Sequence, residues 1–263
     1  MSIPLWTSDF IIGYSMVTET PESITVFSPL RDLSSKSTLL IISFRQLPVY
    51  TKVAFLLLYH NEITGEVKAM KSKMLVINGH PDAQSYCASL AKAYTEGVQE
   101  NSKAQVRNID LSSISFDLNL QYGYGKRMEL ENELLEAQEM IRWADHLIFV
   151  YPIWWGSTPA VLKGFIDRVF LPGFAFKYRQ HSPLWDKLLL GKSAHLIVTS
   201  DTPAWYNRLV YHRAGLNVMK RNVLHFCGIK PVRITEIGPI RPSTSDQRDK
   251  WISHVRELGA KLS

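Results

Sequence analysis

The chain has 263 residues, of which 46% are hydrophobic and 11% aromatic, a composition that excludes a disordered or collagen-like protein. Cys87 and Cys227 are far apart and belong to no metal-binding or disulfide pattern, so we expect no metal site and a reducing, cytoplasmic location. Residues 70–263 carry the basic excess, with 25 Lys and Arg against 18 Asp and Glu. Because these residues form no run with interleaved aromatics, they favour a small phosphorylated ligand over nucleic acid.

The apolar runs predict no membrane span. The longest, residues 38–44 and 53–59, fall short of the roughly 18 residues that cross a bilayer. No Lys or Arg precedes the first apolar stretch, and Asp9 interrupts it, so we also expect no secretory signal.

Residues 1–69 lack the rhythm of the rest of the chain and are interpreted as an N-terminal extension. Gly65-Glu66-Val67 can be encoded by a purine-rich, ribosome-binding sequence just ahead of the Met70 codon. One hypothesis is that residues 1–69 are translated upstream sequence, and that the functional domain is residues 70–263. The alternative is a genuine N-terminal arm that packs on the domain or on a partner.

From residue 73 onward, short apolar runs alternate with longer amphipathic stretches, as in β-α units around a parallel sheet. The first predicted strand, residues 74–78, is followed by a helix over 85–101. A second strand over 104–111 leads through a polar loop to a helix over 129–143, whose apolar side chains recur at helical spacing. The third strand, residues 146–151, is apolar almost throughout, which is typical of a central parallel strand.

The second half of this region continues the alternation. Ser243 and Asp246 have the spacing of a capping box at the start of the last helix. The remaining predicted elements are a helix over 160–170, a strand over 193–199, a helix over 216–227, a strand over 232–237 and a helix over 246–261. Five strands with interleaved helices predict an α/β fold with a doubly wound parallel sheet in the order 2-1-3-4-5. In such sheets, ligands bind at the carboxyl edge.

The most informative segment is the turn between the third strand and its helix. It contains Pro152, Ile153, Trp154, Trp155 and Gly156. Aromatic walls, free backbone N–H groups and small residues suit a flat, redox-active ring. The alternative is a tryptophan-rich turn of an ordinary core, but the position at the predicted edge of the sheet favours the binding site.

The loop after the first strand has the features of an anion site. It runs through His80 to Ser85 and Tyr86, where a helix begins. Free N–H groups and the helix dipole favour a phosphate at such a position. No Walker A loop and no GxGxxG sequence is present, so a Rossmann dinucleotide site is not predicted.

These motifs resemble those of the flavodoxin-like NAD(P)H:quinone oxidoreductases, which include the DT-diaphorase type and bacterial relatives. The resemblance also rests on residues 162–170 (LKGFIDRVF), 172–176 (PGFAF) and 224–228 (LHFCG), and it covers residues 73–260. It implies a flavodoxin-like fold, FMN as cofactor with FAD as the alternative, and NAD(P)H as co-substrate. It also implies a homodimer, for which residues 171–178 are a candidate interface.

The resemblance assigns roles to individual residues. Tyr206 and His212 repeat the spacing of a catalytic pair that stabilises charge on the reduced flavin, whereas Asp201 stands where glycine is usual. The cofactor-binding residues that it implies are His80, Ser85, Tyr86, Pro152, Ile153, Trp154, Trp155, Gly156, Thr199, Ser200 and Asp201.

The predicted function is two-electron hydride transfer from NAD(P)H through the flavin to a quinone or similar acceptor. The alternative is a redox-sensing ancillary subunit that docks on a potassium-efflux membrane transporter. A one-electron flavodoxin shuttle fits less well, because such carriers are usually acidic and lack the Tyr and His pair.

Overall fold

The structure is a computed structural model that describes residues 14–17, 26–29, 72–100 and 104–261. The chain divides into two compact units, Met1–Lys68 and Ala69–Ser263. In the first unit, β1 (Tyr14–Val17) and β2 (Val26–Pro29) pair antiparallel. The hypothesis that residues 1–69 are translated upstream sequence falls mainly outside the described residues and stays a prediction.

The second unit is built on a five-stranded parallel sheet. The order of its strands is β4-β3-β5-β8-β9, which confirms the predicted order 2-1-3-4-5. The central strand β5 is buried at every position, as expected of a parallel strand covered on both faces. The five strands of this sheet are β3 (Ser72–Asn78), β4 (Ala104–Asp110), β5 (His146–Pro152), β8 (Ser193–Thr199) and β9 (Val232–Ile237).

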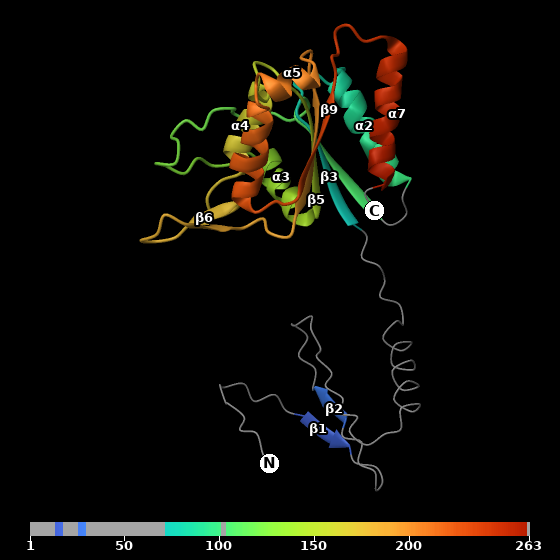
Figure 1. The fold of residues 1–263 in the computed structure, drawn as a ribbon. Helices are drawn as coiled ribbons and strands as arrows, with labels where there is room; N and C mark the ends of the chain where they lie inside the picture. Colours follow the sequence, from blue (N-terminus) through green and yellow to red (C-terminus); the bar gives the residue numbers. More distant parts are fainter. Residues whose placement is uncertain (1–13, 18–25, 30–71, 101–103, 262–263) are drawn as a thin grey trace, which may run out of the picture. The chain divides into compact units, whose positions relative to one another are not determined.

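Helices cover both faces of the sheet (Figure 1). On one face lie α2 (Tyr86–Gln99) and α7 (Ser245–Lys261), and on the other α3 (Asn132–Trp143) and α4 (Ala160–Val169). Side chains of β5 alternate between two core clusters, because successive residues of a strand face opposite sides. On the first face, α2 and α7 pack closely at Gly97, where an added Cβ would lie 1.9 Å from the carbonyl oxygen of Arg256.

Three elements differ from the sequence prediction. The helix expected over 216–227 consists of α6 (Ala214–Asn217) and the π-helix η1 (Val218–His225), followed by two α-helical residues, 226 and 227. The short helix α5 (Ala204–Leu209) and the hairpin of β6 (Phe176–Tyr178) and β7 (Trp185–Lys187) were not predicted.

The capping box of α7 lies one residue further along than predicted. Gln247 N–H donates to Thr244 Oγ1 over 3.3 Å, and Thr244 N–H donates to Gln247 Oε1 over 3.0 Å. The predicted pair of Ser243 and Asp246 is therefore wrong, because the Ser243 hydroxyl donates instead to the carbonyl oxygen of Ile240.

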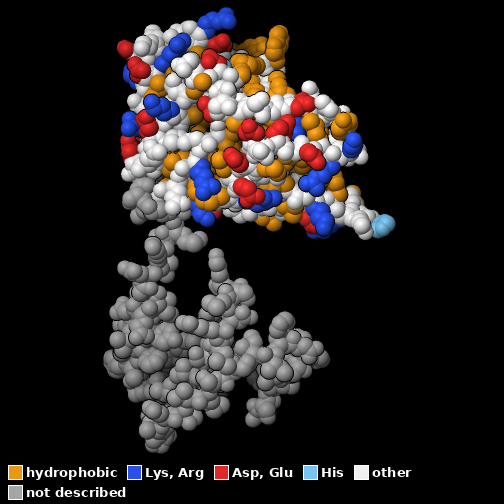
Figure 2. Space-filling model, turned by 180° about the vertical axis from the view of Figure 1, so that it is seen from behind, with side chains coloured by type: hydrophobic (Ala, Val, Ile, Leu, Met, Phe, Trp, Pro, Cys, Tyr) orange, Lys and Arg blue, Asp and Glu red, His pale blue; other side chains and the backbone are white. Residues whose placement is uncertain are grey.

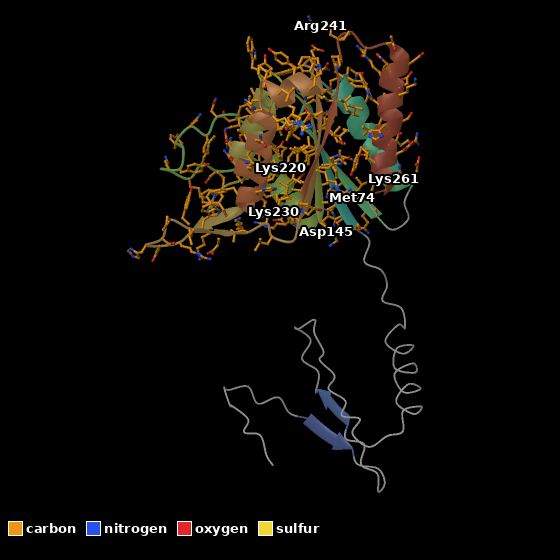
Figure 3. All side chains as sticks on the ribbon, in the orientation of Figure 1. Met74, Asp145, Lys220, Lys230, Arg241 and Lys261 are labelled. Carbon is orange, nitrogen blue, oxygen red and sulfur yellow. The ribbon has the colours of Figure 1, made fainter. Side chains whose placement is uncertain are left out.

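The described residues contain no helix that is long and apolar enough to cross a membrane. Basic and acidic side chains are interspersed over the face shown in Figure 2. Both cysteines are free and buried, and Cys227 belongs to the core as expected. Figure 3 marks the two ends of the sheet: Met74 and Asp145 lie where strands begin, and Arg241 lies near the edge where they end.

Candidate active site

Loops that follow β3, β5 and β8 meet at the carboxyl edge of the sheet and enclose a cavity of about 200 Å³. Eight of the eleven predicted cofactor-binding residues line it, so the sequence prediction that these loops come together is correct in the structure. Ser85, Trp155 and Gly156 are not among the lining residues. The cavity is lined by His80, Tyr86, Cys87, Pro152, Ile153, Trp154, Thr199, Ser200, Asp201 and Ile240.

His80 presents a hydrogen-bond donor to this cavity. The backbone N–H of Asp82 donates to His80 Nδ1 over 2.9 Å. An accepting Nδ1 carries no proton, so the neutral ring carries its proton on Nε2. The imidazole also packs edge-on against Trp154, with ring centroids 5.3 Å apart. These two contacts fix the orientation of the ring and leave Nε2–H available to an acceptor.

The N-terminus of α2 supplies further donors. Ser85 is the N-cap, and its Oγ accepts a hydrogen bond from the N–H of Ala88 over 3.2 Å. Among the described residues, no group accepts a hydrogen bond from the N–H of Tyr86 or Cys87. These two N–H groups and the helix dipole favour a bound anion.

Tyr86 contributes its ring rather than its hydroxyl. The hydroxyl donates to the carbonyl oxygen of Arg248 over 2.8 Å, which ties α2 to α7. Burial raises the pKa of Tyr86 to about 12. Sequence analysis predicted a phosphate contact for this residue, and the structure leaves only the aromatic face and the backbone N–H for that role.

Cys87 lies at the bottom of the cavity with 2% of its surface exposed. Its Sγ is 3.3 Å from Thr199 Oγ1, a hydrogen bond between the first turn of α2 and the end of β8. Burial raises the pKa of the Cys87 thiol to about 11, so the group is neutral at physiological pH. A neutral thiol does not repel a phosphate.

The turn after β5 is tight, and its residues 154–157 are exposed. Trp154 and Ser157 exchange two backbone hydrogen bonds of 3.0 and 2.9 Å. Between them, Trp155 and Gly156 adopt positive φ angles of 50° and 74°, and in the described part of the chain nothing accepts from their N–H groups. Trp155 is fully exposed, so only Trp154 of the predicted pair forms a wall of the cavity.

The loop after β8 is held from the side by the segment that follows β9. Ser200 N–H donates to Ile237 O, and Ile240 N–H donates to Ser200 O, both over 3.1 Å. Asp201 accepts a hydrogen bond of 2.7 Å from the N–H of Arg241. Asp201, which stands where the resemblance expects glycine, therefore ties the loop after β8 to the loop after β9.

Tyr206 and His212 do not line the cavity. Tyr206 is half-buried on α5 and packs edge-on against Trp205 and Tyr211, and His212 is exposed with a φ of 50°. Their segment nevertheless lies beside the turn after β5, because an added Cβ on Gly215 would be 1.9 Å from Gly156 O. Their catalytic roles stay a prediction.

Sequence analysis missed three residues at this site. Cys87 and Ile240 line the cavity, and Arg248 borders it. The Arg248 guanidinium lies 5.9 Å from the centroid of the Tyr86 ring and donates to the carbonyl oxygen of Ile240 over 3.2 Å. No local motif distinguishes these residues, since they reach the site only through the packing of α7 and the loop after β9.

The donors at this edge fit a flavin mononucleotide. The first turn of α2 and His80 Nε2–H suit the phosphate, and the free N–H groups of Trp155 and Gly156 suit the polar edge of the ring. A cavity of about 200 Å³ is smaller than a typical ligand pocket, so the cofactor would fill it and extend across the exposed face of Trp154.

Comparisons with known proteins agree with this fold. The profile of Flavodoxin_2, a family described by its flavodoxin-like fold, matches residues 72–262. The chain is 32% identical over 152 residues to the ribosyldihydronicotinamide dehydrogenase-like protein traD of Penicillium crustosum, across 48% of this chain and 57% of that protein. It is 28% identical to an FMN-dependent NADH:quinone oxidoreductase of Bacillus velezensis, across 72% of this chain and 98% of the relative.

A solved structure is also similar. The crystal structure of Smu.1420 from Streptococcus mutans is 34% identical in sequence and superposes with a TM-score of 0.61. The match covers 72% of this chain and all of that one. These findings confirm the resemblance to the flavodoxin-like NAD(P)H:quinone oxidoreductases.

Proposed function

The chain belongs to the Flavodoxin_2 family of proteins with a flavodoxin-like fold, and from this premise we propose that it is an FMN-dependent NAD(P)H:quinone oxidoreductase. The observation that carries the proposal is the convergence of His80, the first turn of α2 and the Trp154 turn around one cavity at the carboxyl edge. FMN-dependent NADH:quinone activity is named for the relative from Bacillus velezensis, which supports the choice of FMN over FAD.

We assign the phosphate of FMN to the N–H groups of Tyr86 and Cys87, with His80 Nε2–H as a further donor. The Ser85 hydroxyl can donate to the same anion, because its oxygen accepts from Ala88. The ring would lie against Trp154, with its polar edge toward the N–H groups of Trp155 and Gly156. Thr199 and Ser200 would border its other side.

When bound, FMN supplies a hydride acceptor and donor at N5, which couples oxidation of NAD(P)H to two-electron reduction of a quinone. The chain's own groups orient the reactants and exclude water from one face of the ring, chiefly through Trp154 and Ile153. Tyr206 and His212 are proposed to stabilise negative charge on the reduced ring, which requires their segment to approach the cavity. Such closure is common among enzymes that exclude water during the reaction.

We further propose that the enzyme is a homodimer in the cytoplasm, where NADH and NADPH are supplied. Large apolar side chains are exposed beside the site, and a second copy would cover them. The interface that we predicted, residues 171–178, ends at Tyr178, which is 61% exposed. The exposed apolar side chains beside the site are Trp155, Trp205, Leu209, Val210 and Tyr211.

The test is a titration of the purified full chain with FMN and with FAD, followed by assays of NADH and NADPH oxidation with and without menadione. We expect FMN to bind tightly and to support many turnovers that depend on menadione. Trp154→Ala should weaken FMN binding about tenfold or more, because it removes the aromatic wall. Its matched control is Tyr122→Ala, which removes an exposed aromatic ring outside the cavity and should leave FMN affinity unchanged. A folded chain that binds neither flavin would refute the proposal.

A further inference from the structure

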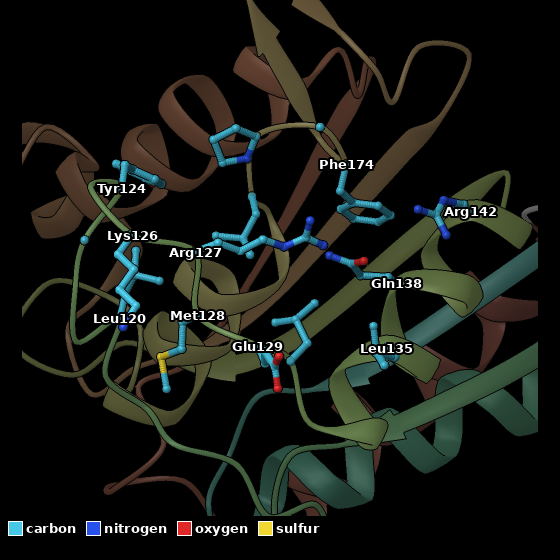
Figure 4. Close-up of a pocket in the computed structure, with 15 residues that line it drawn as sticks. Leu120, Tyr124, Lys126, Arg127, Met128, Glu129, Leu135, Gln138, Arg142 and Phe174 are labelled. Carbon is cyan, nitrogen blue, oxygen red and sulfur yellow. The ribbon is translucent and has the colours of Figure 1, made fainter.

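A cavity of about 960 Å³ lies between residues 120–130, α3 and the turn at residues 171–174 (Figure 4). That turn belongs to residues 171–178, which are the predicted interface of the proposed homodimer. A second copy would cover the turn, so this cavity is not a free surface in the assembly. Glu236 on β9, by contrast, makes its contacts inside one subunit.

Glu236 binds two residues of the loop that carries the proposed catalytic pair. Its Oε2 accepts a hydrogen bond of 2.8 Å from Asn207 Nδ2, and its Oε1 lies 2.5 Å from Arg213 Nη2. Asn207 directly follows Tyr206, and Arg213 directly follows His212. One carboxylate therefore holds the chain beside both members of the pair.

Backbone contacts close the same loop. The N–H of Arg213 donates to the carbonyl oxygen of Asn207 over 2.9 Å, and Asn217 Nδ2 donates to the carbonyl oxygen of His212 over 2.9 Å. His212 and Arg213 adopt positive φ angles of 50° and 53°. Non-glycine residues persist in this conformation where the surrounding contacts fix it, so the loop between α5 and α6 depends on its anchors.

The contacts of Glu236 are largely shielded from water. Asn207 is 8% exposed, and the side chain of Glu236 is 13% exposed. Removing the carboxylate would leave the Asn207 amide without its acceptor at a buried position, which is costly. Glu236 is one residue from the end of β9, a strand that pairs with β8. The anchor is therefore fixed to the carboxyl edge of the sheet.

We propose that Glu236 is a positioning residue for Tyr206 and His212. This role rests on the proposed function, in which both side chains stabilise negative charge on the reduced ring of FMN. Because the carboxylate holds the residue directly after each of them, it sets how the two side chains approach the cavity together. Glu236 does not line the cavity itself, so it acts through the loop rather than on the ring.

The first measurement is hydrogen exchange of the full chain without flavin. We expect Glu236→Gln, which keeps the shape of the side chain but removes its charge, to speed exchange within residues 204–217 about tenfold, because the loop opens more readily. The matched control is Glu257→Gln, which removes a carboxylate from the exposed surface of α7 and should leave this exchange unchanged. Unchanged exchange in Glu236→Gln would overturn the proposal.

The second measurement is the ratio of the Kd for reduced FMN to the Kd for oxidised FMN. A purely structural role would not change this ratio. We expect Glu236→Gln to raise it about tenfold, because the reduced ring loses the equivalent of one hydrogen bond to a charged group. The midpoint potential of bound FMN then becomes about 30 mV more negative. Glu257→Gln should keep the wild-type ratio.

A variant without the pair tests whether Glu236 acts through it. In Tyr206→Phe/His212→Asn, the further change Glu236→Gln should alter the ratio less than about twofold, because there is no longer a pair to position. An unchanged ratio in Glu236→Gln alone, or a tenfold rise that persists without the pair, would refute the role of Glu236 and leave the proposed function intact. A folded wild-type chain that binds no flavin would refute the proposed function and this role with it.

Discussion

Arg168 shows how a single buried charge can hold a long loop in place. Its side chain has no exposed surface and pairs with Glu131 at 2.7 Å. It also binds the backbone carbonyls of Asp117 and Glu129. Hydrogen bonding to the Asp117 N–H and to Arg168 lowers the pKa of Glu131 despite the opposing effect of burial. The guanidinium therefore binds three groups of this loop, the Glu131 carboxylate and the carbonyl oxygens of Asp117 and Glu129.

We expect Arg168→Leu to lower the free energy of unfolding by about 3 to 5 kcal/mol, because it leaves the Glu131 carboxylate and two carbonyls without their donor. Urea denaturation at pH 7 measures this loss. The control is Lys163→Ala on the same helix, which breaks an exposed ion pair with Asp167 and should cost no more than about 0.5 kcal/mol. Equal losses in the two variants would show that the buried ion pair has no special role.

At the scale of elements, Gly215 lets α6 pack directly against the turn after β5. A Cβ at this position would lie 1.9 Å from Gly156 O, which is impossible without movement of the turn. We expect Gly215→Ala to raise the Kd for FMN about tenfold or more, because the N–H groups of Trp155 and Gly156 move with the turn. Gly125→Ala is the matched control, since its nearest neighbour would be 3.6 Å away. FMN fluorescence quenching measures the Kd of both variants. Identical Kd values would show that the contact between α6 and the turn after β5 does not affect FMN binding.

The sequence predicted the elements of the sheet well and the elements near its rim less well. Each of the five strands lies within two residues of its predicted bounds, because buried parallel strands are continuous apolar runs between polar turns. The hairpin of β6 and β7 depends instead on a distant contact, the stacking of Trp185 on Phe226 at 4.3 Å. The π-helix η1 is likewise not visible in apolar spacing alone, because its apolar residues also fit an α-helix.

The same distinction applies to the candidate active site. Topology placed the loops after β3, β5 and β8 together, and the structure confirms it. The contacts of individual side chains in these loops were predicted less well. The Tyr86 hydroxyl is hydrogen-bonded to α7, and the Asp201 carboxylate to the N–H of Arg241. Those partners come from elements far along the chain, so no pattern within the loops predicts them.

At the scale of the whole molecule, two buried histidines make stability depend on pH. His146 on β5 bonds to Ser193 Oγ over 2.7 Å, and His195 on β8 bonds to Thr235 Oγ1 over 2.8 Å. Burial lowers the pKa of each from 6.5 to about 4, with a further contribution from the nearby positive charge of Arg233. Both imidazoles are therefore neutral in the folded protein at neutral pH.

These pKa shifts determine the direction in which stability changes with pH. Above pH 6.5 neither state binds these protons, whereas between pH 6.5 and about 4 only the unfolded chain does, so stability falls as the pH falls through this window. At about 1.4 kcal/mol for each pKa unit, the two histidines together account for several kcal/mol. Urea denaturation at pH 7, 6, 5 and 4.5 should show this loss, with a flatter profile in His195→Gln. His181→Asn, in the exposed loop between β6 and β7, is the control and should keep the wild-type slope, because Asn tolerates the positive φ of 56° at this position.

The domain from residue 70 onward should fold without the residues before it. Every residue in the two described core clusters lies between Met74 and Leu258, and the strands of the parallel sheet begin at Ser72. We therefore expect the polypeptide Met70–Ser263 to unfold within about 2 °C of the Tm of the full chain and to bind FMN with the same Kd. A Tm lower by 5 °C or more would show instead that residues 1–69 stabilise the domain. The mass of the natural protein then tests whether translation starts at Met70, because peptides from the first sixty residues would exclude that start.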